Sequence, residues 1–302
     1  MRSSSPAGPA ARISASGDRF GQAIFEELRR QGDVEGQNLT IERYSGEGRP
    51  EGFADLAREV VSRNPDVIVA ITDAVAQAAR VATGTIPIVW VGGDPIRAGL
   101  ATSLAQPGGN ITGVTVNTGD EIWGKRLQIL KEAVPSASTA AFLDVRGSSM
   151  RVDGPELREA SRRLEISLIG MLFQEPTPPE FQRVFAEIAR NRPDVIIVSS
   201  NGTLVPYRQL IVDSTEKSRL PAMYPWRDYL DVGGLMAYAS DVGEIGRRLA
   251  DDMHQILDGA KPGDIPIYQP TKFEFVINLK AAKALGVTFP PALLALADDV
   301  IE

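Results

Sequence analysis

Short apolar runs alternate with amphipathic segments along most of the chain. Runs rich in Val and Ile and bounded by Gly or Pro predict buried strands at 67–71, 86–91, 111–116, 140–143 and 166–173. Apolar positions three or four residues apart predict helices at 21–31, 53–61, 74–82, 154–163, 179–190 and 243–257. The alternating run LTIERY at 39–44 predicts one more strand. Strands and helices alternating at this spacing predict parallel sheets with helices on both faces.

An internal repeat indicates two lobes rather than one continuous sheet. The segment NPDVIVAITDAVAQAA at 64–79 resembles RPDVIIVSSNGTLVPY at 192–207. Each is followed by a strand introduced by Pro and by a Trp, Trp90 or Trp226. With crossings near 110–117, 237–241 and 265–271, we expect an N-terminal lobe of 1–115 plus 241–264. The C-terminal lobe is then 116–240 plus 265–302.

Composition narrows the function classes. The 302 residues are 43% hydrophobic and 24% charged, which is ordinary for a globular protein with a substantial core. A net charge of −7 without a Lys/Arg cluster argues against a nucleic-acid partner. The absence of Cys and the single His exclude thiol catalysis, disulfides and Cys-based or multi-His metal sites, so no metal or cofactor is expected. No run approaches the roughly 18 apolar residues of a membrane span, and the first 18 residues lack the apolar core of a complete signal peptide.

The predicted ligand site lies where strands end. Open α/β sheets bind small molecules at the carboxyl ends of their strands, especially beside an inter-lobe crossing. The loop Gly92–Pro95, GGDP, lets backbone approach a ligand closely and offers one carboxylate. By this rule the candidate ligand-binding residues are Thr72, Asp73, Ala74, Gly93, Asp94, Thr115, Asn117, Ser148, Ser149, Asn201, Thr203, Tyr224, Trp226 and Tyr238.

Each candidate also has a structural explanation. Thr72 or Asp73 is suited to cap the following helix, and Asp94 before Pro is typical of turns. Serines form loops, and aromatic residues such as Tyr224 pack in cores as often as they line ligand sites. Both explanations stay open for these positions.

Catalytic signatures are weak. The sequence contains no GxSxG, GxxxxGK[ST] or GxGxxG motif. His254 lies in a predicted helix without a recognisable carboxylate or nucleophile partner, which favours a solvated or packed side chain. Asp73 and Asp94 form a carboxylate pair, but no partner base or metal cluster accompanies them, so no catalytic residue is predicted.

Five longer segments together resemble a known family. They are VEGQNLTIERYSGEG (34–48), TIPIVWVGGDPIRAGLATSLAQPGGNITGVT (85–115), GKRLQILKEAVP (124–135), GGLMAYASD (233–241) and QPTKFEFVINLKAAKALGVTFPPALLALADDVIE (269–302). The set is similar to ABC-transporter substrate-binding proteins of the tryptophan/tyrosine-binding type, from about Phe20 to the C-terminus.

This resemblance implies an α/β fold of two doubly wound parallel-sheet lobes joined by a hinge, the clamshell of type I periplasmic binding proteins. It implies a non-enzymatic, periplasmic or extracytoplasmic receptor that closes on one solute and delivers it to a membrane permease with its ATPase. Segments 72–74 and 201–203 and Asp94 match places where such proteins contact ligand, and Tyr224 and Tyr238 fall in matching segments of the second lobe. Family members begin with a signal peptide and a first strand, whose place is occupied here only by Arg12–Ser16.

The ligand is expected to be amino-acid-like, and the protein a monomer. Asp94 or Asp73 would hold an amine, backbone N–H groups and hydroxyls a carboxylate, and Trp226 or Tyr224 a ring. Two other function classes remain. A small-molecule-sensing regulatory domain shares this fold but needs a DNA-binding segment, which the residues before Gly21 do not predict. An enzyme on the same fold would show turnover that disappears in Asp94→Asn.

Overall fold

The computed structural model describes residues 19–45, 50–116, 121–146 and 154–302, so Asn117, Ser148 and Ser149 of the predicted site lie outside the described residues. The chain divides into two compact units: Met1–Asn117 with Val242–Pro270 (unit 1) and Thr118–Asp241 with Thr271–Glu302 (unit 2). Residues 265–270, which the sequence-based division assigns to the second lobe, group with unit 1. Their backbone explains this, because the Ile267 N–H donates to Leu104 O and the Thr115 N–H donates to Tyr268 O.

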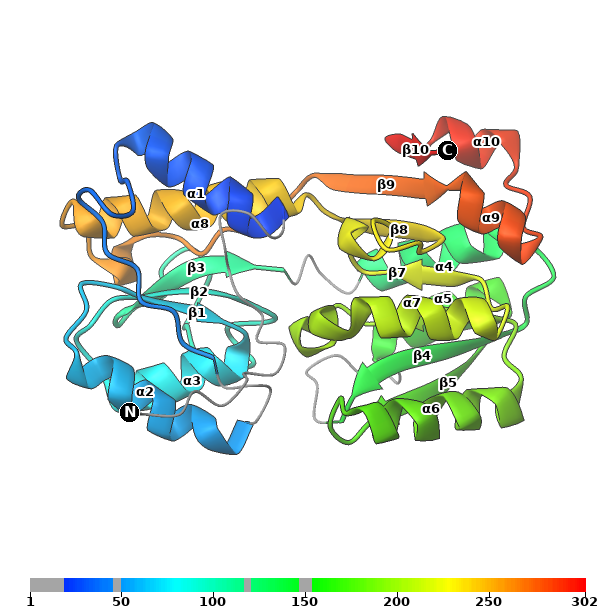
Figure 1. Ribbon diagram of the computed structural model, residues 1–302, viewed down its shortest axis with the longest axis horizontal. Helices are drawn as coiled ribbons and strands as arrows, with labels where there is room; N and C mark the ends of the chain where they lie inside the picture. The colour runs from blue at the N-terminus through cyan, green and yellow to red at the C-terminus, as the bar shows by residue number, and fades with distance from the viewer. Residues whose placement is uncertain (1–18, 46–49, 117–120, 147–153) are drawn as a thin grey trace, which may run out of the picture. The chain divides into compact units, whose positions relative to one another are not determined.

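Unit 1 is a parallel sheet covered on both faces. Its described elements are α1 (Arg19–Gln31), η1 (Pro50–Gly52), α2 (Phe53–Ser62), β1 (Ile68–Ile71), α3 (Asp73–Ala82), β2 (Ile88–Gly92), β3 (Ile111–Thr115), α8 (Val242–Leu257) and η4 (Pro262–Asp264). Within the described ranges, β1, β2 and β3 form a three-stranded sheet in that order. Figure 1 shows α1 and α8 on one face of this sheet and α2 and α3 on the other. Burial on both faces explains why β2 and β3 contain no charged residue and why β2 is almost continuously apolar.

Gly113 allows β3 to pair closely with β2. It lies opposite Trp90 in the β2–β3 register and has φ of 140°. A Cβ at this position would lie 1.8 Å from the Trp90 carbonyl oxygen. Only glycine combines this backbone conformation with so close an approach, so the buried Trp90 ring and the neighbouring strand depend on it.

The strand expected at 39–44 is wrong. Only Leu39 takes part in an isolated bridge, with Glu35, and the following residues are irregular. The Arg43 side chain instead pairs with Glu35 at 2.7 Å and lies 5.4 Å from the Phe25 ring centre. A strand forms only where a neighbour completes its backbone hydrogen bonds, and none of the described strands pairs with this run.

Unit 2 contains a larger sheet. Its described elements are α4 (Glu121–Ala133), β4 (Thr139–Val145), α5 (Pro155–Leu164), β5 (Ser167–Phe173), α6 (Pro178–Asn191), β6 (Val195–Val198), η2 (Gly202–Tyr207), α7 (Arg208–Lys217), β7 (Ala222–Tyr224), η3 (Arg227–Tyr229), β8 (Met236–Ser240), β9 (Phe273–Asn278), α9 (Leu279–Leu285), α10 (Pro291–Ala295) and β10 (Asp299–Ile301). The strand order over the described residues is β10-β9-β8-β7-β6-β4-β5. All neighbours are parallel except β8 and β9, which pair Ser240 with Phe273. The chain leaves unit 2 after Asp241 and returns at Thr271, so β9 starts beside the end of β8 and runs the opposite way.

Helices cover both faces of the unit 2 sheet. Residues of α4, α5 and α10 pack with β4, β6, β8 and β9 in one apolar cluster, where Trp123 meets Phe142 at 5.3 Å between ring centres. On the other face lie α6 and α7 (Figure 1), where Phe181 packs on Phe173 at 4.5 Å. Across the described ranges, none of the helices combines the length and apolar character required to cross a bilayer.

Candidate functional site

The strand ends of unit 1 bring two carboxylates near each other. The Asp73 carboxylate, at the start of α3, accepts a hydrogen bond of 2.9 Å from the Gly93 N–H after β2. Gly92 leaves room for it, because a Cβ there would lie 2.2 Å from the Asp73 Oδ1 atom. Burial raises the pKa of Asp73, the Gly93 N–H and the Trp90 indole act in the opposite direction, and the charge of Asp94 adds to the rise. The indole N–H itself makes no well-aligned hydrogen bond.

The corner between β1 and α3 is strained. Thr72 has φ of 89° and ψ of 154°, a conformation that β-branched residues rarely adopt. Its N–H donates to Val91 O at 2.9 Å, but its side chain does not cap α3. Thr72 therefore occupies the N-cap position without capping the helix through its side chain, and no cap side chain accepts from the first N–H groups of α3. Backbone strain of this kind concentrates at functional sites, and the exposed Ala74 lies directly beside it.

The side chains of Asp94 and Thr115 both make hydrogen bonds to backbone groups of unit 1. The Asp94 Oδ1 atom accepts from the N–H groups of Ile96 and Arg97 at 2.9 and 3.1 Å, which is the turn role considered from the sequence. Its Oδ2 atom accepts nothing from the described residues. Thr115 is buried, and its hydroxyl donates to the Gly93 carbonyl oxygen. Unit 1 thus presents one half-buried carboxylate, Asp73, and one free carboxylate oxygen of Asp94, which suit an ammonium group or a hydroxyl donor.

In unit 2, the segment after β6 holds Asn201 and Thr203. The Asn201 Oδ1 atom accepts from the Thr203 N–H at 3.0 Å and from its hydroxyl at 2.7 Å, so Asn201 caps η2. Both side chains are half-buried, which keeps them accessible at the carboxyl end of the strand.

The Arg126 side chain on α4 hydrogen-bonds to β8 and to the residues that follow β6 and β7 in unit 2. It is 1% exposed and donates to the Tyr238 carbonyl at 2.7 Å, the Ser200 hydroxyl at 2.8 Å and the Pro225 carbonyl at 3.2 Å. Its guanidinium stacks on the Trp123 ring at 4.6 Å. Burial lowers the pKa of Arg126 to about 9, which leaves the side chain positively charged at neutral pH.

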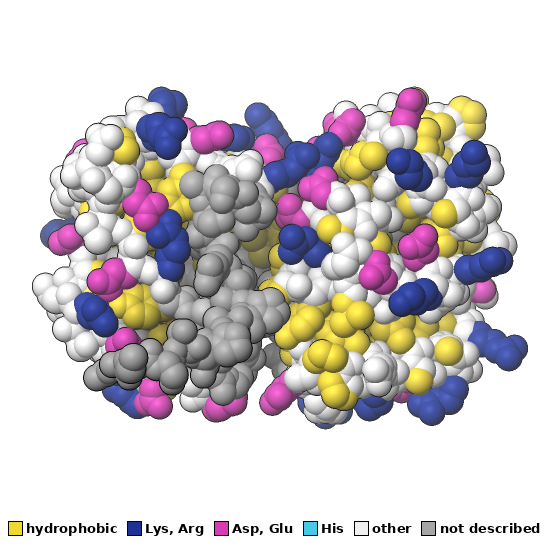
Figure 2. All heavy atoms as spheres, in the orientation of Figure 1, with side chains coloured by type: hydrophobic (Ala, Val, Ile, Leu, Met, Phe, Trp, Pro, Cys, Tyr) yellow, Lys and Arg dark blue, Asp and Glu magenta, His cyan; other side chains and the backbone are white. Residues whose placement is uncertain are grey.

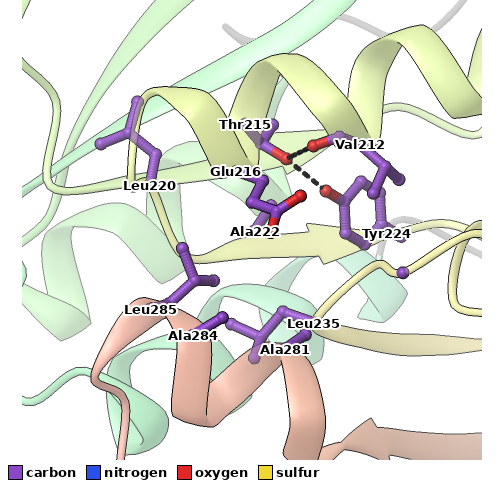
Figure 3. A pocket seen from close by; sticks show the side chains of 11 residues that line it. Val212, Thr215, Glu216, Leu220, Ala222, Tyr224, Leu235, Ala281, Ala284 and Leu285 are labelled. Atoms are coloured by element: carbon purple, nitrogen blue, oxygen red, sulfur yellow. Dashed lines mark hydrogen bonds between the residues drawn. The ribbon is translucent and has the colours of Figure 1, made fainter.

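Tyr224 lies inside the core of unit 2. It is 1% exposed, its hydroxyl meets that of Thr215 at 2.6 Å, and its ring stacks on Tyr229 at 5.1 Å. Figure 3 shows this pair of hydroxyls in a small pocket lined by α7, β7 and α9. Leu220 and Ala222, which line the same pocket, precede and begin β7, so the pocket lies toward the amino end of that strand. These contacts favour core packing over a ligand wall for Tyr224.

Tyr238 and Trp226 differ in accessibility. Trp226, after β7, is 9% exposed, whereas the Tyr238 ring on β8 is half-buried. Tyr238 stacks on Phe273 with ring centres 5.4 Å apart and an interplanar angle of 11°. Burial raises the pKa of the Tyr238 hydroxyl. The Tyr238–Phe273 pair is thus the aromatic surface that unit 2 offers beside its strand ends.

His254 has partners that the sequence did not reveal. Its Nδ1 atom lies 2.7 Å from the Asp33 carboxylate and its Nε2 atom 3.5 Å from that of Asp258. The expectation that it lacks a carboxylate partner is therefore wrong. The Asp33 partner could not be foreseen, because it lies 221 residues away in sequence. In the part of the chain that the structure describes, no cluster of three or more His, Asp or Glu side chains is arranged to hold a metal ion.

Two site residues, Arg126 and Ser200, were missed from the sequence. For Arg126 a signal existed: it lies three residues after Trp123 and four before Leu130, within the apolar stripe of α4. A charge in such a stripe is buried and must be hydrogen-bonded. Ser200 carries no comparable signal, since a serine after a strand is ordinary loop composition.

The sequence and the fold were also compared with those of known proteins. The family model described as ABC transporter substrate binding protein matches residues 14–301. A tyrosine-binding protein of Clostridioides difficile is 25% identical over 274 residues, covering 89% of this chain and 77% of the relative. A conserved domain protein from Vibrio cholerae superposes with a TM-score of 0.85 at 28% identity, covering 93% and 94% of the two chains. An ABC domain from Streptococcus pneumonia in complex with L-Trp gives 0.83 at 25% identity, covering 94% and 95%.

The fold and these similarities define a solute-binding protein of the periplasmic-binding-protein-like type I class. The chain belongs to the ABC transporter substrate-binding protein family. Its role is therefore that of a receptor that binds a small molecule for an ABC permease, in a family of extracytoplasmic type.

Proposed function

We propose that this receptor captures an amino acid with an aromatic side chain for import. The observation that carries the proposal is the placement of Asp73 and Asp94 at adjacent strand ends of unit 1, where they suit an ammonium group. The half-buried Tyr238–Phe273 pair supplies an aromatic surface in unit 2. Relatives with 25% identity support the same ligand class, since one is named for tyrosine and another was crystallised with L-Trp.

The proposed contact set consists of strand-end residues. It comprises Thr72, Asp73, Ala74, Gly93 and Asp94 in unit 1 and Asn201, Thr203 and Tyr238 in unit 2. Thr115, Tyr224 and Trp226 support these positions from within the cores. Their burial, together with the Thr115 and Tyr224 hydroxyl bonds, supports this assignment.

The proposal includes a periplasmic location, a monomeric receptor, no nucleic-acid partner and no catalytic step. Figure 2 shows Lys/Arg and Asp/Glu side chains of both signs on the visible face of each unit, and the net charge is −7. Mixed charge of this kind does not attract a polyanion. Light scattering would report a single-chain mass, and incubation with ligand would return it chemically unchanged.

Isothermal titration calorimetry with L-tryptophan, L-tyrosine, L-phenylalanine, L-leucine and benzoate tests the ligand class. The expected result is saturable binding of at least one aromatic amino acid, with leucine and benzoate at least about tenfold weaker because each loses the ring or the ammonium contact. Native mass spectrometry of gently purified protein provides a second readout, a retained mass equal to the ligand. Binding of none of the aromatic amino acids, or tighter binding of benzoate, would refute the proposal.

A further inference from the structure

The carboxyl end of β6 in unit 2 presents hydrogen-bond donors above a buried positive charge. Ser200 and Asn201 are the second and third residues after the strand, beyond the buried Ser199, and are half-buried. The guanidinium of Arg126 lies beneath them, and it forms no ion pair with any described carboxylate. All three of its acceptors are neutral oxygen atoms, of Ser200, Pro225 and Tyr238.

Arg126 determines which way the Ser200 hydroxyl donates. Its Nη1 group donates to the Ser200 oxygen at 2.8 Å. A guanidinium has five donors and no acceptor, so the Ser200 proton cannot return to it. The hydroxyl proton is therefore directed to another acceptor, and the positive charge behind the oxygen strengthens it as a donor.

The side-chain amide of Asn201 is also held with its donor group available. Its Oδ1 atom accepts from the Thr203 N–H and hydroxyl. A backbone N–H only donates, so this contact fixes the oxygen of the side-chain amide toward Thr203. The amide NH₂ is then the end that remains for a ligand, and it donates to none of the described residues.

We propose that Ser200 and Asn201, supported by the charge of Arg126, form the subsite for the carboxylate of the bound amino acid. Two neutral donors backed by a desolvated cation match a carboxylate, which accepts several hydrogen bonds and carries the opposite charge. The start of α3 in unit 1 fits this role less well, because the Asp73 carboxylate lies in its first turn. The inference rests on the proposed function and assigns to unit 2 the end of the ligand that unit 1 repels.

Calorimetry with L-tryptophan and L-tryptophanamide separates this role from general support of the fold. The two ligands share size, ring and ammonium group, and differ in the charge of the carboxyl end. Wild-type protein is expected to bind L-tryptophan about tenfold or more tightly than the amide. Ser200→Ala and Asn201→Asp should each weaken L-tryptophan by about tenfold or more and weaken the amide clearly less, because hydrogen bonds to an uncharged carbonyl are weaker than those to a carboxylate.

The variants are chosen to keep the fold. Asp at position 201 still accepts from Thr203 and caps η2, but it replaces the NH₂ donor by a negative oxygen. Ser214→Ala is the matched control, because it removes a hydroxyl that bonds only to Leu210 O of its own helix. Its affinities for both ligands should equal those of the wild type.

Equal weakening of both ligands by Ser200→Ala and Asn201→Asp would assign them a structural role and overturn the subsite. So would an unchanged preference for L-tryptophan in both variants. Either result leaves the proposed function standing, since L-tryptophan still binds the wild type. Failure of the wild type to bind any aromatic amino acid would refute the proposed function, and the subsite with it.

Discussion

Replacing Asp252 by Asn is expected to stabilise the protein, and by more at alkaline pH than in mild acid. Asp252 lies on α8 of unit 1 and is 0% exposed. Arg248 approaches its Oδ1 atom at 3.2 Å, yet neither carboxylate oxygen accepts a well-aligned hydrogen bond. Burial raises its pKa to about 7, with Arg248 opposing the rise and Asp251 adding to it.

The direction of the pH dependence follows from this raised pKa. Below the ordinary value of 3.8, Asp252 is protonated in both the folded and the unfolded chain and contributes no difference. As the pH rises toward 7 the unfolded chain loses this proton while the folded protein keeps it, so the free energy of unfolding falls. At about 1.4 kcal/mol per pKa unit, the full loss is about 4 kcal/mol, of which about 2 kcal/mol falls between pH 5.5 and 8.

Urea unfolding of wild type and Asp252→Asn at pH 5.5 and 8 measures this effect. The stability advantage of the variant should grow by about 2 kcal/mol between the two pH values. Arg248 tolerates the loss of its partner, because its side chain is 30% exposed and lies over the Tyr268 ring. Asp264→Asn, at an exposed position, is the control for the loss of one carboxylate outside the core. An advantage that is constant with pH, or a variant less stable at pH 8, would refute the reasoning.

Three further substitutions test the site and the core. Asp73→Asn keeps an acceptor for the Gly93 N–H but loses the negative charge. Calorimetry should show an affinity for L-tryptophan about tenfold weaker and an unchanged affinity for indole-3-propionate, which has no ammonium group. A loss of affinity for both ligands would contradict the ammonium role. Tyr224→Phe removes the hydroxyl that hydrogen-bonds with Thr215. The free energy of unfolding in urea should fall by about 1 kcal/mol, with no change in ligand affinity. A clear loss of affinity would show that Tyr224 contacts the ligand. Gly113→Ala places a methyl group against the Trp90 carbonyl and should cost several kcal/mol; a melting temperature equal to that of the wild type would show that the strands move apart without strain.

The fold was predictable because its main signal is local. Strands buried on both faces exclude charged residues and favour apolar ones, as β2 and β6 show, while β3 adds only Gly and two Thr. The repeat of this pattern at 64–79 and 192–207 indicated two units of one design. The run at 39–44 alternates apolar and polar residues as a strand does, but none of the described strands pairs with it. Whether such a run forms a strand depends on a neighbouring strand, which the run itself does not reveal.

The site was less predictable because side-chain direction depends on distant contacts. Tyr224 turns into the core to meet Thr215 on α7, and His254 meets Asp33 across 221 residues. The strand-end rule concerns backbone topology and selected Asn201 and Asp73 as candidate ligand residues, and both side chains are half-buried in the structure. Arg126 was missed because it touches the strand ends from a helix, outside the loops that the rule singles out.

Each unit is assembled from two separated stretches of chain, and this sets the order in which the protein can fold. The Gln31 side chain on α1 bonds to Asp251 on α8, 220 residues later, and β8 acquires its neighbour β9 only after the chain has passed through unit 1. During synthesis, neither apolar core can close before these late segments leave the ribosome. Contacts of such long sequence separation slow folding and prolong exposure of apolar surface. Apolar surface of both units therefore stays exposed on the nascent chain until residues 242–302 have emerged.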